Sequence, residues 1–482
     1  MSGRNKQLKI HSVKYNVVMN MILTSSSFIF PLITVPYVSR VLSTSGNGLI
    51  AFAQSTTNYF GLFAVMGMSA YGIREVAKVR DDGAALSKLV RELLVILLTT
   101  STISYAAFLI AIFTIPKLRE NTVLMLVFGF TIWLTAFGVE WFFQGVEQYD
   151  YITIRNIAVK LTGIVLMFVL VHEVSDYIVY GVIVVVSSYG SNVINILRLR
   201  KLVDLRQHER IEIKRHFKPL ISFAISSISS GMYVQIDIVL TGFMMSTSMV
   251  GLYQLATKIK SLAYAVVTSV GNVMLPRLSY YRGKDDIDEY NTLISKNFNF
   301  MFIAGMAIIG WMVFCGRPII LIIAGTDFIG AQYALACIAP TILFAAGNAT
   351  LTQCLITQGK ERAYALVSLL GLVFAFFFNM TLIPLLGIVG AALSNVLCEM
   401  VTFMFRAYMV RNTMKQILPA LDYWKTILAF AVAACAACAI AKFTLPMGVV
   451  VEFLAFSVTF GGLYAGMLII LKERFIQSML RR

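Results

Sequence analysis

The sequence predicts an all-α polytopic membrane protein with fourteen transmembrane helices, on the basis of three observations. Hydrophobic residues make up 58% of the 482 residues and charged residues only 13%, with a mean hydropathy of +0.79, outside the range of soluble domains. The apolar runs have the length of about 20 residues that crosses a bilayer as a helix. When these runs are taken as spans, 32 of the 40 Lys and Arg residues fall on one side, five on the other and three within the spans.

This charge bias also predicts the orientation of the chain. Basic residues near span ends are retained on the cytoplasmic side, so both termini are expected in the cytoplasm. The basic segment Met1–Lys14 precedes a first span that is too long for a signal-peptide core and has no cleavage pattern. We interpret the net charge of +16 as a rim that faces anionic headgroups rather than as a nucleic-acid site.

The spans follow one another with short loops. In the first half we expect them at 15–39, 48–72, 90–113, 121–143, 153–172 and 177–198. The second half continues with 219–243, 250–275, 295–315, 331–356, 364–384 and 387–408, and two further spans lie at 424–442 and 449–471. Basic residues collect after the second, the sixth and the last span, while the outer loops are short and nearly free of them. This length leaves no room for a soluble catalytic domain.

An internal repeat relates the two halves. Gly48 and Arg74 recur as Gly251 and Arg277, each at an offset of 203 residues. The acidic pair 81–82 recurs as 285–286 and the Gln-Gly pair 144–145 as 358–359, so spans 1–6 match spans 7–12 in the same orientation. Two parallel six-helix bundles of this kind enclose a cleft that alternating access requires.

The repeat sets the predicted domain bounds. They are an N-terminal bundle at 1–200, a basic cytoplasmic linker at 201–218, a C-terminal bundle at 219–411, two extra spans at 424–471 and a cytoplasmic tail at 472–482. The extra spans have no counterpart in the repeat. They either cover an exposed flank or form the wall of a groove open to lipid.

Ionisable residues inside the spans are candidate functional groups, because a charge at mid-membrane costs roughly 2.5–3.5 kcal/mol unless it has a partner or faces water. Asp237 and Lys258 lie at similar depth on adjacent spans, either as a structural ion pair or as part of a cavity. Lys260 points about 200° away from Lys258 around the helix. We therefore expect that one of the two lysines is not satisfied by Asp237.

Four further charges complete this set. Arg40 ends the first span and either anchors to headgroups or faces the cleft. Lys160 is close enough to the cytoplasmic face to reach it, and Glu140 is close enough to pair with a loop arginine. Glu399, near the middle of span 12, is either a proton or cation site or half of an interhelical pair. The set is slightly cationic, which suits an anionic substrate such as a diphosphate.

Catalytic constellations are not evident in the sequence. The four histidines lie in loops or at span edges, without metal-ligand spacing or a nucleophile and base arrangement. We therefore expect a transporter without a metal or a catalytic residue.

Several short segments carry a resemblance to a known family. They are Val35–Leu42, the segment that begins at Gly48, Tyr71–Glu75, and Trp141–Gly145 through Ile154–Asn156. In their order, and with fourteen spans, they resemble the Wzx-type flippases for O-antigen and capsule repeat units. These flippases belong to the polysaccharide transporter family, in the superfamily that also holds the multidrug and toxin extruders (MATE) and the lipid II flippase. The resemblance covers essentially the whole chain.

The resemblance implies a MATE-like fold and a function in surface polysaccharide biosynthesis. The substrate would be an undecaprenyl-diphosphate-linked oligosaccharide, moved from the cytoplasmic to the outer leaflet of the bacterial inner membrane. By their depth, Arg40, Lys258 and Lys260 match the cationic cavity of the family. The resemblance implies no cofactor and leaves coupling open to a proton or sodium gradient, with Glu399 and Glu140 as candidates, or to the membrane potential. Membrane lipids, a polysaccharide polymerase and a chain-length regulator are the other expected partners.

Three tyrosines within the spans are candidates for contact with the sugar. Tyr233, Tyr253 and Tyr264 would stack on sugar rings if they face the cavity, whereas most aromatics in spans serve packing or interfacial belts.

An ion-coupled drug extruder of the same superfamily is one alternative function, for which twelve spans would be expected. A membrane polymerase or acyltransferase is another, which would need a large outer loop or a buried catalytic set.

Overall fold

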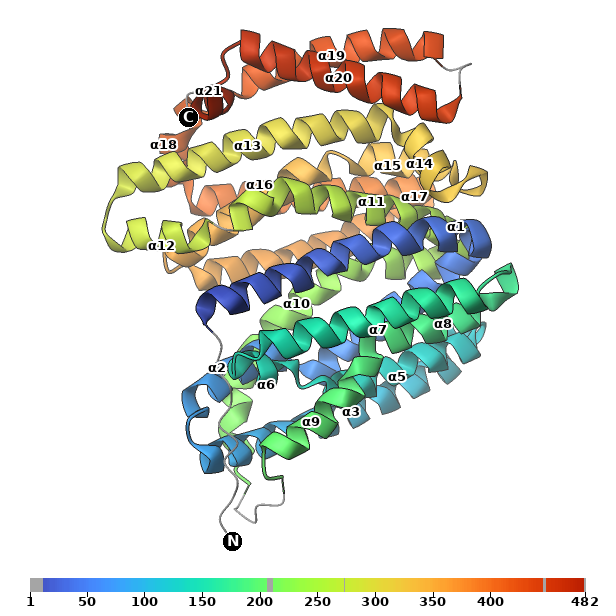
Figure 1. Ribbon diagram of the computed structural model, residues 1–482, viewed down its shortest axis with the longest axis vertical. Helices are drawn as coiled ribbons and strands as arrows, with labels where there is room; N and C mark the ends of the chain where they lie inside the picture. Colours follow the sequence, from blue (N-terminus) through green and yellow to red (C-terminus); the bar gives the residue numbers. More distant parts are fainter. Residues whose placement is uncertain (1–11, 206–210, 273, 445–447, 481–482) are drawn as a thin grey trace. The chain divides into compact units, whose positions relative to one another are not determined.

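The computed structural model describes residues 12–205, 211–272, 274–444 and 448–480, and all regular elements in these ranges are helices (Figure 1). The chain divides into two compact units, Met1–Gln235 and Ile236–Arg482. The all-α prediction is confirmed. The division falls inside a helix that begins within the predicted linker, and the finer domain bounds stay a prediction.

The first unit is built from nine α-helices and the beginning of a tenth. They are α1 (Val13–Val65), α2 (Met68–Val79), α3 (Gly83–Thr114), α4 (Pro116–Arg119), α5 (Thr122–Gly138), α6 (Glu140–Gly145), α7 (Tyr149–Leu170), α8 (Tyr177–Val185) and α9 (Ser191–Leu202), with α10 (Lys214–Met244) continuing into the second unit. A 3₁₀ turn, η1 (Val174–Asp176), precedes α8, and a π-helical turn, η2 (Val186–Gly190), joins α8 to α9.

The second unit continues from the end of α10 to the C-terminus. Its helices are α11 (Thr247–Asn272), α12 (Leu275–Gly283), α13 (Ile287–Phe314), α14 (Gly316–Ala324), α15 (Ala331–Ile338), α16 (Thr341–Thr357), α17 (Glu361–Met409), α18 (Arg411–Ile417), α19 (Tyr423–Thr444), α20 (Val449–Ile470) and α21 (Arg474–Leu480). Short 3₁₀ turns, η3 (Thr326–Phe328) and η4 (Leu418–Ala420), lie before α15 and after α18.

Two of the long helices contain a break that the sequence predicts as a loop. Ser43 has φ 57° within α1, and Gly387 has φ 60° within α17. The side-chain amide of Asn47 donates to the carbonyls of Ser43 at 2.9 Å and Val38 at 3.3 Å, so it satisfies groups near the break. Each of these two helices is thus long enough for two crossings.

Eleven helical segments in the described chain are long and apolar enough to cross a membrane, the two broken ones counted once each. Helix α11 has the length but not the apolarity of these eleven. The protein is a multi-pass membrane protein, and the number of fourteen crossings stays a prediction.

The repeat that the sequence predicts is visible in the local structure of the two halves. Asp82 caps α3 by accepting from the backbone N–H groups of Ala84 at 3.0 Å and Ala85 at 3.1 Å. Asp286 caps α13 in the same way, through Glu289 at 3.2 Å. In both halves the acidic pair follows a short helix, α2 or α12, and starts a long one. An N-cap carboxylate satisfies backbone donors that would otherwise be unpaired.

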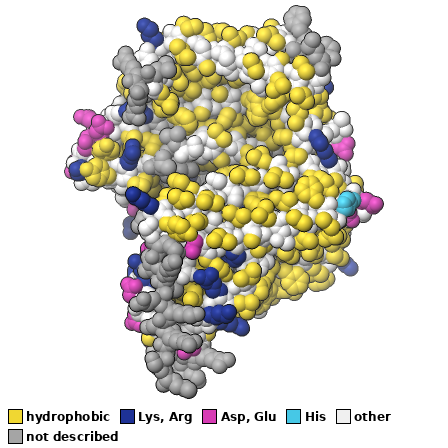
Figure 2. All heavy atoms as spheres, viewed as in Figure 1, with side chains coloured by type: hydrophobic (Ala, Val, Ile, Leu, Met, Phe, Trp, Pro, Cys, Tyr) yellow, Lys and Arg dark blue, Asp and Glu magenta, His cyan; other side chains and the backbone are white. Residues whose placement is uncertain are grey.

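The surface of each unit is apolar where a soluble protein would be polar. Figure 2 shows hydrophobic side chains over most of the visible face, and Val458 and Leu385 are 72% and 76% exposed. Inside the first unit, aromatic and aliphatic side chains such as Trp141, Phe142 and Leu93 form a continuous core. An apolar exterior around a packed interior is expected for helices in contact with acyl chains.

Helices α19 and α20 form a hairpin that packs on α13 (Figure 1). The Tyr464 hydroxyl donates to the carbonyl of Ile303 at 2.9 Å, and the indole N–H of Trp311 donates to the Ser457 hydroxyl at 3.1 Å. Stacked rings of Phe456, Phe460 and Tyr464 fill the contact. The two spans outside the repeat are therefore fixed to the second unit by polar as well as apolar contacts.

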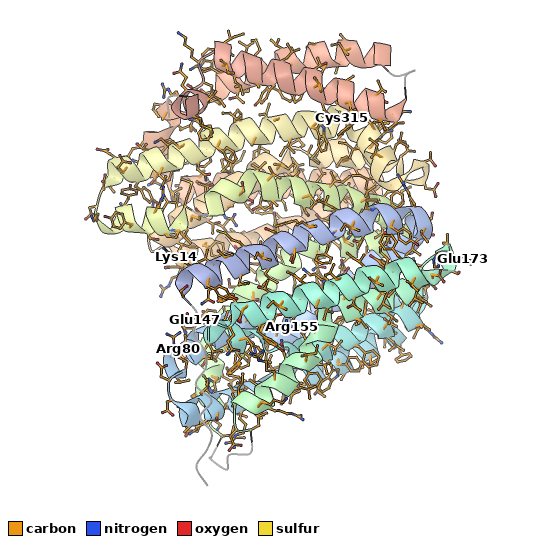
Figure 3. The ribbon with its side chains drawn as sticks, in the orientation of Figure 1. Lys14, Arg80, Glu147, Arg155, Glu173 and Cys315 are labelled. Atoms are coloured by element: carbon orange, nitrogen blue, oxygen red, sulfur yellow. The ribbon has the colours of Figure 1, made fainter. Side chains whose placement is uncertain are left out.

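The two ends of the first unit differ as the predicted topology requires. Lys14, Arg80 and Glu147 lie together at one end, and Glu173 lies at the other (Figure 3). Arg80 pairs with Glu147 at 2.5 Å, and this carboxylate raises the pKa of Arg80 above its ordinary value. The basic loops thus share one end, while the orientation in the membrane stays a prediction.

Candidate functional site

The predicted site residues divide between the two units. Asp237, Tyr253, Lys258, Lys260, Tyr264 and Glu399 lie in the second unit, on α10, α11 and α17. Arg40, Glu140 and Tyr233 lie in the first unit. The second unit joins three of these residues, Asp237, Tyr253 and Lys260, in one polar network inside the helix bundle.

Asp237 is the centre of this network. Its side chain belongs to a residue only 5% exposed, and its carboxylate accepts three hydrogen bonds. The amides of Asn379 and Asn395 donate to it at 2.8 and 2.6 Å, and the Tyr253 hydroxyl donates at 3.0 Å. These donors come from α11 and from both halves of α17, on either side of the break at Gly387. A buried carboxylate is tolerated when such donors replace its water.

Lys260 is connected to Asp237 through an asparagine rather than directly. Its ammonium group donates to the side-chain oxygen of Asn395 at 3.1 Å, and the same amide donates to Asp237 through its nitrogen. Asp237 and Glu399 are the two carboxylates that act electrostatically on Lys260. The half-buried ammonium is thus linked to Asp237 through a neutral amide.

Lys258 has a different environment. It is half-buried on α11, and within the described residues the structure shows no hydrogen bond or ion pair for it. The sequence predicts that Asp237 cannot satisfy both lysines, and the described carboxylate is engaged by Asn379, Asn395 and Tyr253 instead. Lys258 therefore lies outside the hydrogen-bonded network, with capacity for an anionic partner.

Glu399 lies on α17 about one turn after Asn395, the partner of Lys260. The amide of Asn348 on α16 donates to its carboxylate at 2.6 Å and to its carbonyl at 3.0 Å. A guanidinium N–H of Arg406 donates to the carbonyl of Asn348 at 3.4 Å. Both Glu399 and Arg406 act electrostatically on the half-buried Tyr264. Glu399 thus contacts Asn348 across the two helices, and its role as a proton or cation site stays a prediction.

The tyrosines predicted to stack on sugar have different surroundings. Tyr253 is fully buried, and its hydroxyl contacts Asp237, so its ring has no free face. Tyr233 and Tyr264 are half-buried. We assign Tyr253 to positioning Asp237 and leave the stacking hypothesis to the other two.

The first unit holds its predicted charges separately. Glu140 pairs with Arg155 on α7 at 2.6 Å, and that guanidinium side chain is only 4% exposed. Lys160 donates to the hydroxyls of Ser27 at 3.0 Å and Ser26 at 3.4 Å. Arg40 is exposed on α1, three residues before the break at Ser43. Its role as a substrate cation stays a prediction.

Sequence reasoning missed the asparagines that organise the second unit. Asn348, Asn379 and Asn395 each donate to a carboxylate. Their signal was present, since each is an amide within an apolar run, where side chains of this kind usually hydrogen-bond across helices. A search for charges alone passes over them.

Comparison with known proteins shows which protein family the chain matches and which relatives it is similar to. The family described as polysaccharide biosynthesis protein matches residues 13–282. A candidate O-antigen transporter of Shigella dysenteriae is 22% identical over 401 residues, covering 82% of this chain and 98% of that protein. A candidate O-antigen transporter of Escherichia coli K12 is 21% identical, with 83% and 97% covered. A candidate flippase for low-salt glycan biosynthesis of Haloferax volcanii matches 38% of the chain and 39% of that protein at 24% identity.

Two solved structures share the fold. The lipid II flippase MurJ in an inward closed conformation aligns with a TM-score of 0.70 at 13% identity, covering 94% of this chain and 100% of that one. An inward-facing multidrug resistance MATE transporter of the MOP superfamily aligns with a TM-score of 0.59 at 14% identity, covering 83% and 99%. These likenesses confirm the MATE-like fold.

Proposed function

Because the chain belongs to the family of polysaccharide biosynthesis proteins, we propose that it is a flippase that carries a lipid-linked oligosaccharide across the membrane. The observation that supports this most is the match to two O-antigen transporter relatives along more than four fifths of the chain. The fold of a lipid II flippase agrees with it. The protein is therefore a transporter of the Wzx type and not an enzyme.

The substrate in this proposal is an undecaprenyl-diphosphate-linked repeat unit, moved by alternating access from the cytoplasmic to the outer leaflet of the inner membrane. Both termini would then be cytoplasmic, and a polymerase with its chain-length regulator would receive the product. The diphosphate is the chemical group that the half-buried lysines are suited to bind. Lysine meets a phosphate as a point charge and does not need a fixed geometry.

Lys258 and Lys260 would bind this diphosphate in different ways. Lys258 has no partner among the described residues, so an incoming anion would relieve the cost of its partial burial. Lys260 is already tethered to Asn395 and would orient the anion from a fixed position. Arg40 is the third cation of the proposal. Tyr233 and Tyr264 would stack on the sugars.

Coupling to a proton or sodium gradient is assigned in this proposal to Glu399, with Glu140 as the second candidate. Glu399 acts electrostatically on Lys260, so a change in its charge would be felt at this substrate cation. Glu140 is already neutralised by Arg155 and has the weaker case. The membrane potential acting on the half-buried lysines is the alternative source of energy.

The proposal is tested by complementing a strain from which the gene has been deleted. Lys258→Ala and Lys260→Ala should each lower the export of surface polysaccharide, and the double variant should lower it by about tenfold or more, the effect of losing a charged hydrogen bond. The amount of protein in the membrane should stay normal. Lys284→Ala removes an exposed lysine of the same unit and serves as the control.

The deletion strain itself distinguishes the flippase from a drug extruder. A flippase should leave a lipid-linked saccharide in the inner leaflet when it is absent. Increased drug sensitivity with no such lipid would support the multidrug transporter instead. Normal polysaccharide from the double lysine variant would remove the assignment of the binding cations.

A further inference from the structure

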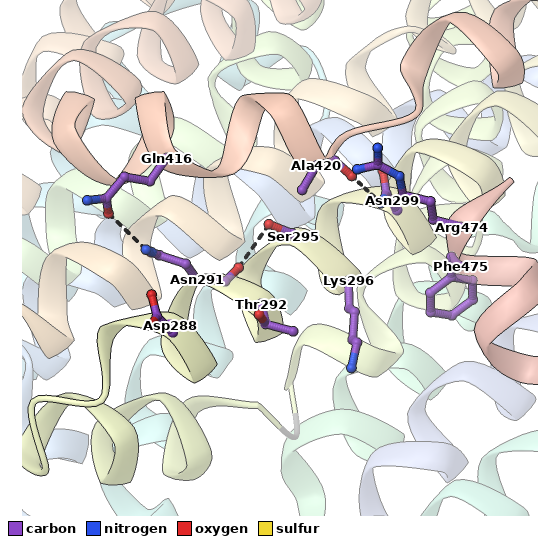
Figure 4. Close-up of a pocket in the computed structure, with 10 residues that line it drawn as sticks. All are labelled: Asp288, Asn291, Thr292, Ser295, Lys296, Asn299, Gln416, Ala420, Arg474 and Phe475. Atoms are coloured by element: carbon purple, nitrogen blue, oxygen red, sulfur yellow. Dashed lines mark hydrogen bonds between the residues drawn. The ribbon is translucent and has the colours of Figure 1, made fainter.

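A cavity of about 490 Å³ opens at one end of the second unit, apart from the polar network around Asp237. It lies between the first turns of α13, the segment formed by α18 and η4, and the C-terminal helix α21 (Figure 4). In the predicted topology this end of α13 and the segment after α20 face the cytoplasm. The cavity is therefore expected at the level of the lipid headgroups of the inner leaflet.

Hydrogen bonds hold the walls of this cavity in place. Asn291 on α13 donates to the side chain of Gln416 on α18 at 2.8 Å (Figure 4). Asn299 donates to the carbonyl of Ala420 at 3.1 Å and accepts from the backbone N–H of Asp422 at the same distance. The cavity is formed by connected elements and does not depend on a loose loop.

The C-terminal helix is fixed to the same wall by a buried acid. Asp422 accepts from the backbone N–H of Arg474 at 3.0 Å and from the ammonium group of Lys425 at 2.9 Å. The Arg474 guanidinium also donates to the carbonyl of Pro419 at 3.2 Å. These contacts place Arg474 and Phe475 at the edge of the cavity.

The cavity is lined by more positive than negative charge. Lys296 and Arg474 contribute two cations, and Asp288 is the one acid among the lining residues. Lys296 is exposed, and within the described chain the structure shows no hydrogen bond or ion pair for it. Arg474 lies 3.7 Å from Asp422, which compensates part of its charge. Lys296 is thus the cation that remains available for an anionic ligand.

Aromatic side chains in and near the cavity favour a lipid over a free anion as its ligand. Tyr423 and Trp424 begin α19 beside the cavity wall and are 51% and 54% exposed, as expected of side chains at the membrane interface. Phe475 lines the cavity and packs against Phe300 with a ring separation of 5.6 Å. A phosphate next to Lys296 would have its glycerol and first acyl carbons over this apolar surface.

We propose that this cavity binds the phosphate headgroup of an anionic glycerophospholipid from the inner leaflet, with Lys296 as the principal contact. Basic pockets between helices on the cytoplasmic side are suited to acidic headgroups, which this leaflet supplies in excess. The bound lipid would join α13 to α21 and stabilise the C-terminal helix on the second unit.

The test is native mass spectrometry of the full-length protein in detergent, titrated with phosphatidylglycerol. The wild type should bind a first lipid more tightly than it binds phosphatidylcholine. Lys296→Gln should weaken that first binding by about tenfold, the effect expected for a charged hydrogen bond. Lys296→Arg should preserve it. Lys284→Gln removes a lysine outside the cavity and should leave the affinity unchanged.

Three outcomes would overturn the proposal. The first is equal affinity of the wild type and Lys296→Gln for phosphatidylglycerol. The second is equal binding of the zwitterionic lipid. The third is displacement of the lipid by millimolar inorganic phosphate together with an equal rise in Tm from phosphate alone, which would identify a site for a soluble anion. Because Lys296 is exposed, Lys296→Gln should fold normally, and its thermal unfolding without added lipid checks this.

Discussion

Asn395 connects the two opposite charges of the second unit. Its amide nitrogen donates to Asp237 at 2.6 Å, and its oxygen accepts from Lys260 at 3.1 Å. A direct ion pair would satisfy both charges and leave neither for a substrate. A neutral amide between them fixes both positions and leaves the Lys260 side chain partly accessible. This arrangement is suited to a site that binds an anion and later releases it.

Replacing this asparagine should therefore destabilise the second unit. Asn395→Ala leaves the Asp237 carboxylate short of a donor and Lys260 without its acceptor, at a cost of about 1–3 kcal/mol for each unsatisfied buried group. The measurement is the thermal unfolding of the purified protein in detergent. Asn412→Ala removes an exposed asparagine on α18 and should leave Tm unchanged. Equal Tm values for the two variants would show that the bridge is unimportant for stability.

At the scale of single residues, the sequence predicts which charged residues lie within the apolar spans, but not which residues they contact. Asp237, Lys258 and Lys260 stand out because charge within an apolar run is costly. The partners of Asp237 are set by how α10, α11 and α17 are rotated about their axes. That rotation depends on the packing of many side chains, and helical spacing alone does not determine it. The sequence alone therefore does not decide whether Asp237 and Lys258 form an ion pair or line a cavity.

Helix α10 is the element that continues from one unit into the other. A buried acid on α3 anchors its first turn to the first unit. Glu92 is fully buried and accepts from Arg215 at 2.5 Å, from the His216 ring at 2.9 Å and from the backbone N–H of Glu212 at 2.8 Å. The other ring nitrogen of His216 contacts the Tyr71 hydroxyl at 2.6 Å. The end of the basic linker is thus tied to α2 and α3.

Loss of this anchor should loosen the linker. Glu92→Ala leaves the buried His216 ring and the half-exposed Arg215 without their acceptor, and one unsatisfied buried group costs about 1–3 kcal/mol. We expect faster trypsin cleavage within residues 198–218 and a lower Tm. Glu212→Ala is the matched control, because the exposed Glu212 side chain pairs with Lys88 at 3.3 Å on the surface. A linker equally resistant in Glu92→Ala and the wild type would contradict the anchoring role.

Where a run of apolar residues alone defines a helix, the observed helix lies close to the predicted span. The predicted loops near 40–47 and 385–386 appear as the breaks at Ser43 and Gly387, within helices that otherwise continue. A short outer loop needs only one residue outside helical geometry, so hydropathy locates it but cannot give its form. Hydropathy could not predict that Glu92 anchors the linker. Its partners lie more than a hundred residues away, in the linker.

At the scale of the molecule, the duplicated halves and the family give a common account. Each half starts a long helix with an aspartate cap after a short helix, and the two extra helices α19 and α20 pack on α13. The fold could be predicted because the spans, the charge bias and the repeat can each be identified from the order of residues, without knowledge of tertiary contacts. The substrate could be predicted only through resemblance, since no motif in the sequence specifies a sugar.

The central claim is that the protein moves a lipid-linked oligosaccharide by means of half-buried lysines within its helices. Transport by the purified protein tests this claim most directly. The protein is reconstituted into liposomes that carry a short undecaprenyl-diphosphate oligosaccharide, and a glycan-cleaving enzyme outside measures how much of the substrate becomes accessible. The wild type and Lys284→Ala should expose nearly all of it. The Lys258→Ala, Lys260→Ala double variant should expose little beyond the half already outside. Equal exposure by the double variant and the wild type would contradict the role of these cations, and no exposure by the wild type would contradict the flippase.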